Sequence, residues 1–152
     1  MLIYRISKSK YVATALLGNG SALAPGRWNS AGMRLAYAAT SVSLAMLEVL
    51  VHVNREDVPL GLRLLTYAIP DAAVADLPAT HWPPGWDKLP YNDAVRAVGD
   101  GFVRDNRHLA MRVPSVVARG EFNILINPAH ASFGDIALQA NNPLAMDERL
   151  FE

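Results

Sequence analysis

Residues 40–53 read TSVSLAMLEVLVHV, and this almost uninterrupted apolar stretch constrains the fold more than any other part of the chain. Thr40 or Ser41 can cap the start of a helix here. A helix that is apolar on nearly every side is expected to be buried nearly all round. The sequence therefore predicts a buried helix over residues 40–53.

Glu48 lies in the middle of this predicted helix and fits it least. Helical spacing places Ser41, Ala45, Glu48 and His52 on one stripe. A carboxylate in apolar surroundings must be paired, must be protonated, or must face a cavity that a ligand fills, because an unpaired buried charge is costly. Glu48 is thus a candidate catalytic carboxylate, although a helix edge that reaches solvent, or an ion pair with an arginine, would also explain it.

The length and composition predict one folded domain, residues 1–152. The chain has 152 residues, of which 51% are hydrophobic and 18% charged, as in a compact folded protein. Strands and helices are mixed without a regular βαβ rhythm, which favours the α+β class. The clearest expected strands are residues 2–6, 33–38, 62–69, 108–113 and 124–126, and the clearest expected helices are residues 11–17, 40–53 and 92–104.

Charge and composition also narrow the partners. The net charge is zero and no basic stripe is visible, so direct nucleic-acid binding is not expected. A chain with so few charges tends to associate, which favours a homo-oligomer or a hetero-oligomer. The sequence has no secretory signal and no run of roughly 18 apolar residues, so a cytoplasmic protein without a membrane segment is expected.

Several common catalytic and cofactor motifs are absent from the sequence. There is no cysteine, and the four histidines do not pair at metal-ligand spacing, so no metal is expected. Glycine-rich dinucleotide and P-loop motifs are absent, as is the G-x-S-x-G motif of serine hydrolases. Any catalytic chemistry must therefore come from residues outside these patterns.

The segment GRWNSAG, residues 26–32, ends a long predicted loop that begins at Gly18. The planar fork of Arg27 suits phosphate or carboxylate oxygens, although a surface arginine stacked on Trp28 is an alternative. Asn29 is either a ligand contact or an ordinary turn residue.

Two further polar residues lie in or just after predicted strands. Tyr37 either packs in the core or offers a flat platform to a ring. Ser115 follows the Val-Pro pair that ends the strand 108–113. Because a nucleophilic serine needs a base within reach, Ser115 is interpreted as a turn residue or a ligand-binding residue.

The order of several short motifs resembles that of a known family. These are YR at 4–5, GRWN at 26–29, Tyr37, the helix S-x-x-x-A-x-x-E that carries Glu48, VPS at 113–115, EFNILINPAH at 121–130 and DERLF at 147–151. Together they resemble the RES domain, the toxin of bacterial RES–Xre toxin–antitoxin systems. The resemblance extends from Tyr4 to Phe151, but nothing is carried over for residues 71–107.

The resemblance implies a split α+β core similar to the ADP-ribosyltransferase toxin fold, built around a cleft for NAD+. NAD+ would be the substrate, and its nicotinamide–ribose bond would be broken by hydrolysis or phosphorolysis, which arrests growth. The partner would be an Xre-family antitoxin with a DNA-binding domain and a segment that blocks the cleft.

The resemblance also implies roles for individual residues. Arg27 would grip the pyrophosphate or the ribose on the nicotinamide side, and Tyr37 would stack on nicotinamide. Glu48 would stabilise positive charge on the ribose, and Ser115 would orient a ribose or amide group. Asn29 belongs to the cofactor-binding GRWN motif.

Two matters stay open at this point. Asn123 and Asn127 belong to the family's motif without an assigned role. The function also has two alternatives, which are a mono-ADP-ribosyltransferase with one protein target and a catalytically silent interaction domain.

Overall fold

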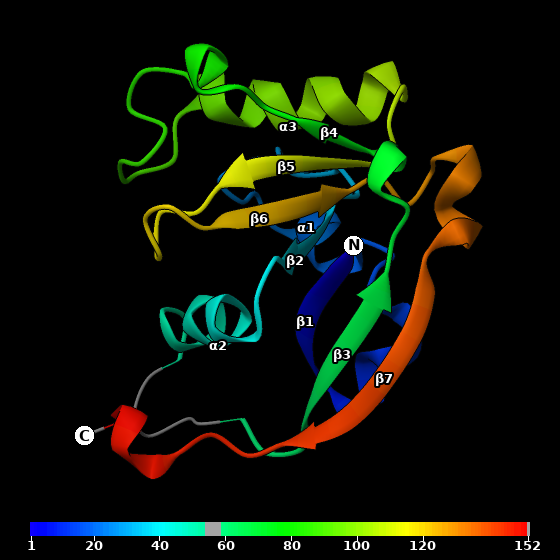
Figure 1. Cartoon of the computed structure of the whole chain (residues 1–152). Coiled ribbons are helices and arrows are strands. Elements are labelled where there is room, and N and C mark those ends of the chain that lie inside the picture. Colours follow the sequence, from blue (N-terminus) through cyan, green and yellow to red (C-terminus); the bar gives the residue numbers. More distant parts are fainter. Residues whose placement is uncertain (54–58, 152) are drawn as a thin grey trace.

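The computed structural model describes residues 1–53 and 59–151, and these form one mixed sheet of seven strands with helices packed around it (Figure 1). The strands are β1 (Leu2–Lys8), β2 (Ala36–Ala39), β3 (Leu62–Ala68), β4 (Val74–Asp76), β5 (Ala110–Pro114), β6 (Phe122–Ile126) and β7 (Ala137–Leu144). The α-helices are α1 (Asn19–Leu23), α2 (Val42–Leu50) and α3 (Asp93–Asp105). Short 3₁₀ helices cover Ser9–Thr14, Asp71–Ala73, Ala79–His81, Ala131–Asp135 and Glu148–Phe151.

The α+β prediction is confirmed, and most expected elements are present. The predicted helix 92–104 is α3, and every clearly predicted strand has a counterpart in the sheet. The prediction of a helix over 11–17 is wrong, since a 3₁₀ helix ends at Thr14 instead. The long predicted loop also contains α1, a helix too short for the period of its apolar residues to reveal.

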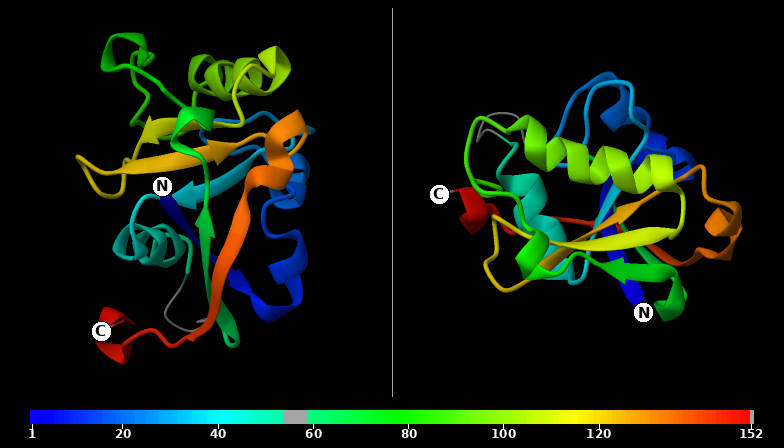
Figure 2. Two further views of the ribbon diagram at one scale, coloured as in Figure 1. Left: turned by 45° about the vertical axis from the view of Figure 1, so that its right-hand side comes forward. Right: turned by 90° about the horizontal axis from the view of Figure 1, so that it is seen from above.

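The sheet is split between β1 and β2, and this split positions the site. The strand order is β4-β5-β6-β2-β1-β3-β7, and β4 with β5 is the parallel pair among the described strands. β1 pairs with β3 along its whole length, but it meets β2 through the single pair Tyr4 and Ala39. The half β4-β5-β6-β2 and the half β1-β3-β7 consequently diverge (Figures 1 and 2).

The helix α3 covers the first half of the sheet. Its buried apolar side chains, Val95 and Phe102, recur at the helical period and face β5 and β6. The side chain of Asn92 caps the helix by accepting from the Val95 amide at 2.9 Å, and Asn106 ends it in the left-handed conformation. The core on this side consists of Trp28, Leu35, Val95, Phe102, Met111, Val113 and Leu125.

The helix α2 is shorter and more exposed than the sequence predicts. Ser41 caps it as expected, since its Oγ accepts from the Leu44 amide at 3.1 Å. The prediction of burial nearly all round is wrong, because Leu44 and Ala45 alone are buried within α2 and Val51, just after it, is 56% exposed. The physical reason is that α2 packs against β1 and β2 through one side, which leaves another side to border the cleft.

Candidate active site

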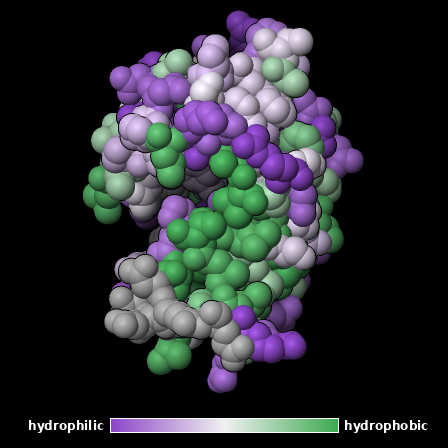
Figure 3. All heavy atoms as spheres, turned by 90° about the vertical axis from the view of Figure 1, so that its left-hand side faces the viewer, coloured by the Kyte–Doolittle hydropathy of each residue, from purple (hydrophilic) through white to green (hydrophobic). Residues whose placement is uncertain are grey.

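A cleft of about 890 Å³ opens where the two halves of the sheet diverge. Its walls come from β1, β2 and α2, from the GRWN loop, from residues 89–91, and from the turn after β5. Figure 3 shows the face that carries this hollow, between a mainly hydrophilic upper part and a hydrophobic lower part. The volume lies near the upper end of the range typical of small-molecule sites.

Glu48 faces this cleft from α2. Together with Ala45 and His52 it lines the cleft, so these three members of the predicted stripe do share one side of the helix. Its Oε1 accepts a hydrogen bond from Asn123 Nδ2 at 2.6 Å and one from Ser115 Oγ at 3.2 Å. Within the described residues, Glu48 forms no ion pair and Oε2 has no hydrogen-bond partner. One oxygen is therefore held in place while the other can accept from a ligand.

Ser115 lies behind Glu48 and not on the cleft surface. Its side chain is buried, and its Oγ also accepts from the Ala118 amide at 3.1 Å. Both bonds fix the hydroxyl in the turn that follows β5. The geometry therefore favours a role in orienting Glu48 over direct contact with a ligand.

Tyr37 lines the cleft from β2, and Asn29 holds its hydroxyl from behind. The Tyr37 hydroxyl donates to Asn29 Oδ1 at 2.6 Å, and burial raises the pKa of that hydroxyl. Asn29 is itself buried, and its Nδ2 donates to the carbonyls of Ser21 and Ser30. Asn29 therefore positions Tyr37, while the tyrosine ring meets the cleft.

The variant Tyr37→Phe tests this positioning. We expect it to lower the free energy of unfolding by about 1–3 kcal/mol, because the buried Asn29 Oδ1 loses its donor. The phenylalanine ring should still line the cleft at position 37. Urea unfolding gives the measurement, and Tyr67→Phe is the matched control, since Tyr67 is a buried strand tyrosine whose hydroxyl has no hydrogen bond within the described residues. Equal losses in the two variants would contradict the positioning role.

Arg27 is held by residues 86–91, a segment that lies far from the GRWN loop in the sequence. Its Nη1 donates to the carbonyls of Trp86 at 2.5 Å and Lys88 at 3.1 Å, and its guanidinium lies 4.7 Å from the centre of the Tyr91 ring. The stacking partner is thus Tyr91 and not Trp28, which is buried in the core. Within the described residues, Nε and Nη2 have no hydrogen-bond partner, so that edge of the guanidinium can take an anion.

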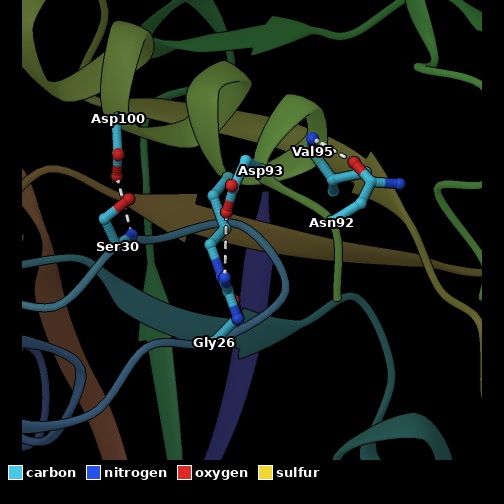
Figure 4. A network of polar contacts seen from close by, with 7 residues as sticks. Gly26, Ser30, Asn92, Asp93, Val95 and Asp100 are labelled. Atoms are coloured by element: carbon cyan, nitrogen blue, oxygen red, sulfur yellow. Dashed lines mark hydrogen bonds and ion pairs between the residues drawn. The ribbon is translucent and has the colours of Figure 1, made fainter. Parts of the chain in front are cut away.

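The helix α3 fixes the GRWN loop from the other side (Figure 4). The Ser30 amide donates to the buried carboxylate of Asp100 at 2.9 Å, and Arg96 Nε donates to the Gly26 carbonyl at 3.2 Å. Between these contacts, α3 packs directly on the loop backbone at Gly99. The backbone that carries Arg27 is therefore preorganised.

Arg5 is a cleft residue that sequence reasoning missed. It lines the cleft from β1, and its Nη1 donates to the carbonyl of Tyr37. Its Nε is buried without a hydrogen-bond partner in the described chain, and burial lowers the pKa of the guanidinium. A buried cation with an unsatisfied donor is rare and favours an anionic ligand. The available signal was the YR pair at 4–5, but an arginine in a strand normally faces solvent.

Two features do not occur in the described ranges 1–53 and 59–151. No group of three or more histidine, aspartate or glutamate side chains there could hold a metal ion. None of the helices there has the length and apolar character needed to cross a membrane.

The family of the chain follows from a match over almost its whole length. The RES domain family model matches residues 2–148. The chain therefore belongs to the RES domain family, as the order of its motifs predicted.

Individual relatives are similar over most of the chain. A protein of Yersinia enterocolitica named "Toxin Res" is 36% identical over 99% of both chains. A protein of a Sphingobium species named "Prs ADP-ribosylating toxin" is 37% identical over 79% of this chain and 76% of its own length. A chain in the crystal structure of the M. tuberculosis MbcT–MbcA toxin–antitoxin complex shares the fold, with a TM-score of 0.76 at 22% identity, covering 99% of this chain and 86% of that one.

Proposed function

We propose that this protein is a toxin that cleaves the nicotinamide–ribose bond of NAD+. The observation that carries the proposal is that Glu48 and Arg27 line the same cleft, whose volume suits a dinucleotide. The name of the Sphingobium relative supports it, because ADP-ribosylation consumes NAD+ as the donor.

Glu48 acts on the bond that breaks. Both electrons of the bond between the nicotinamide nitrogen and ribose C1′ leave with nicotinamide, so positive charge builds on the ribose. The carboxylate, with Oε1 fixed by Asn123 and Ser115, stabilises this charge more in the transition state than in the ground state. Water then bonds to C1′ and releases a proton, which gives ADP-ribose, or phosphate attacks and gives ADP-ribose 1-phosphate.

The remaining cleft residues hold the substrate. The free edge of Arg27 binds the diphosphate through two N–H donors, and Arg5 supplies a second positive charge in the same cleft. The ring of Tyr37 stacks on nicotinamide and keeps water from the departing ring. No protein nucleophile is needed for this reaction.

The partner in this proposal is an antitoxin of the Xre family that blocks the cleft. The names of the curated relatives and the fold shared with a chain of a toxin–antitoxin complex support such a partner. The Xre identity and its DNA-binding domain come from the motif resemblance alone. NAD+ loss in the cytoplasm would arrest growth, and binding of the antitoxin would prevent that loss.

A time course with the purified chain tests the reaction. We expect each NAD+ that is consumed to release one nicotinamide. In buffer without phosphate, the other product should be ADP-ribose. Addition of phosphate distinguishes phosphorolysis, which yields ADP-ribose 1-phosphate. If NAD+ is neither cleaved nor bound in a calorimetric titration, the proposal is wrong and the alternative of a catalytically silent interaction domain is supported.

Transfer of ADP-ribose to one protein is the second candidate, and the name of the Sphingobium relative favours it specifically. The same bond breaks, but a target side chain replaces water as the attacking group. Incubation with labelled NAD+ and a cell lysate separates the two reactions. A single labelled protein band indicates transfer, whereas label in free ADP-ribose or its 1-phosphate indicates hydrolysis or phosphorolysis.

A further inference from the structure

Residues 86–91 form a wall of the cleft that the motif resemblance does not cover. Leu89 and Tyr91 line the cleft from this wall. Leu89 is 74% exposed, so the wall presents an apolar side chain that the described chain leaves mostly uncovered. A mostly exposed leucine and an aromatic ring that both line the cleft offer a surface that a flat apolar group can bury.

This wall is held in place from two sides. Asp87 forms an ion pair with Arg119 at 2.8 Å, and the Arg119 guanidinium lies 5.4 Å from the centre of the Trp86 ring. Arg27 binds the carbonyls of Trp86 and Lys88. The wall is therefore formed before any ligand arrives, which reduces the ordering cost of binding.

Arg27 connects the wall to the anion site. Its Nη1 holds the wall and its guanidinium lies against Tyr91, whereas Nε and Nη2 remain for an anion. A diphosphate bound to that free edge is consequently next to Tyr91. A group attached to the far side of the diphosphate can then reach Tyr91 and Leu89.

We propose that Leu89 and Tyr91 form the binding site for the second ring of the dinucleotide, the adenine that is not cleaved. This rests on the proposed function, in which Glu48 meets the ribose of nicotinamide and Arg27 meets the diphosphate. The covalent order of NAD+ then places adenine beyond Arg27, where the structure presents a preformed apolar wall. Leu89 and Tyr91 thereby make the cleft specific for a dinucleotide over a mononucleotide.

Two substrates and two variants test the site. Nicotinamide mononucleotide contains the same scissile bond but lacks the adenylate half. We expect Tyr91→Ala and Leu89→Ser to lower kcat/KM for NAD+ on the order of tenfold, the usual scale of lost stacking on a base. For nicotinamide mononucleotide, kcat/KM of Leu89→Ser should stay within about twofold of wild type. Tyr91→Ala is compared for NAD+ alone, because it also removes the ring against which the Arg27 guanidinium lies. The matched controls are Tyr11→Ala and Leu23→Ser, since both side chains are exposed and neither lines the cleft.

A binding measurement separates this proposal from the proposed function. Calorimetric titration with AMP should show affinity on the order of tenfold weaker in both Tyr91→Ala and Leu89→Ser than in wild type. Equal losses of kcat/KM for both substrates in Leu89→Ser would overturn the adenine site, because the wall would then serve the chemistry or the fold. If wild type cleaves neither substrate, the proposed function is wrong, and the AMP titration alone decides on the wall. Unchanged AMP affinity in Leu89→Ser would then overturn the adenine site.

Discussion

Replacing Glu48 with glutamine is expected to slow NAD+ cleavage on the order of a hundredfold or more while the protein stays folded. Glutamine has nearly the same shape, and its amide oxygen can still accept from Asn123 and Ser115. What disappears is the negative charge that faces the ribose as positive charge develops there. The loss should appear mainly in kcat, because the charge acts on the transition state.

The matched control is Glu121→Gln, which makes the same change outside the cleft. Glu121 is also half-buried and accepts a hydrogen bond from a serine, Ser41 Oγ, at 2.5 Å. Steady-state kinetics should show Glu121→Gln close to wild type. Thermal unfolding must show both variants folded. Cleavage by Glu48→Gln at the wild-type rate would show that Glu48 is not the residue that stabilises the charge.

The helix α2 shows what periodicity can and cannot predict. Residue spacing placed Ala45, Glu48 and His52 on one stripe, and all three line the cleft. Burial nearly all round was wrong, because apolar composition does not say how many neighbours a helix has. Here the sheet divides at the single pair Tyr4 and Ala39, so α2 packs on one side and borders an opening on another.

The candidate site likewise contains residues that the sequence could predict and residues that it could not. Arg27, Tyr37 and Glu48 could be placed together because the order of their motifs resembles a family, and the structure brings all three to one cleft. The YR pair was too weak a signal to identify Arg5 as a site residue, because its buried and unsatisfied Nε exists only after β1 has packed. The bond from Asn123 to Glu48 likewise depends on how β6 and α2 meet.

Replacing Gly99 with alanine is expected to lower the free energy of unfolding by about 3 kcal/mol, at the upper end of overpacking costs. A Cβ at Gly99 would lie 1.7 Å from the carbonyl oxygen of Trp28 and 2.8 Å from its carbonyl carbon. Both atoms belong to the backbone, so no side-chain rotation relieves the clash. Either α3 or the GRWN loop must shift.

Gly101→Ala on the same helix is the matched control. A Cβ there meets nothing within 4 Å, so alanine should stabilise α3 by up to about 1 kcal/mol through its higher helix propensity. Urea unfolding of the two variants should therefore give shifts of opposite sign. Because the loop that must move carries Arg27, Gly99→Ala should also raise KM for NAD+, whereas Gly101→Ala should not. If both variants are as stable as wild type, α3 does not pack directly on the loop, and the preorganisation of Arg27 must have another source.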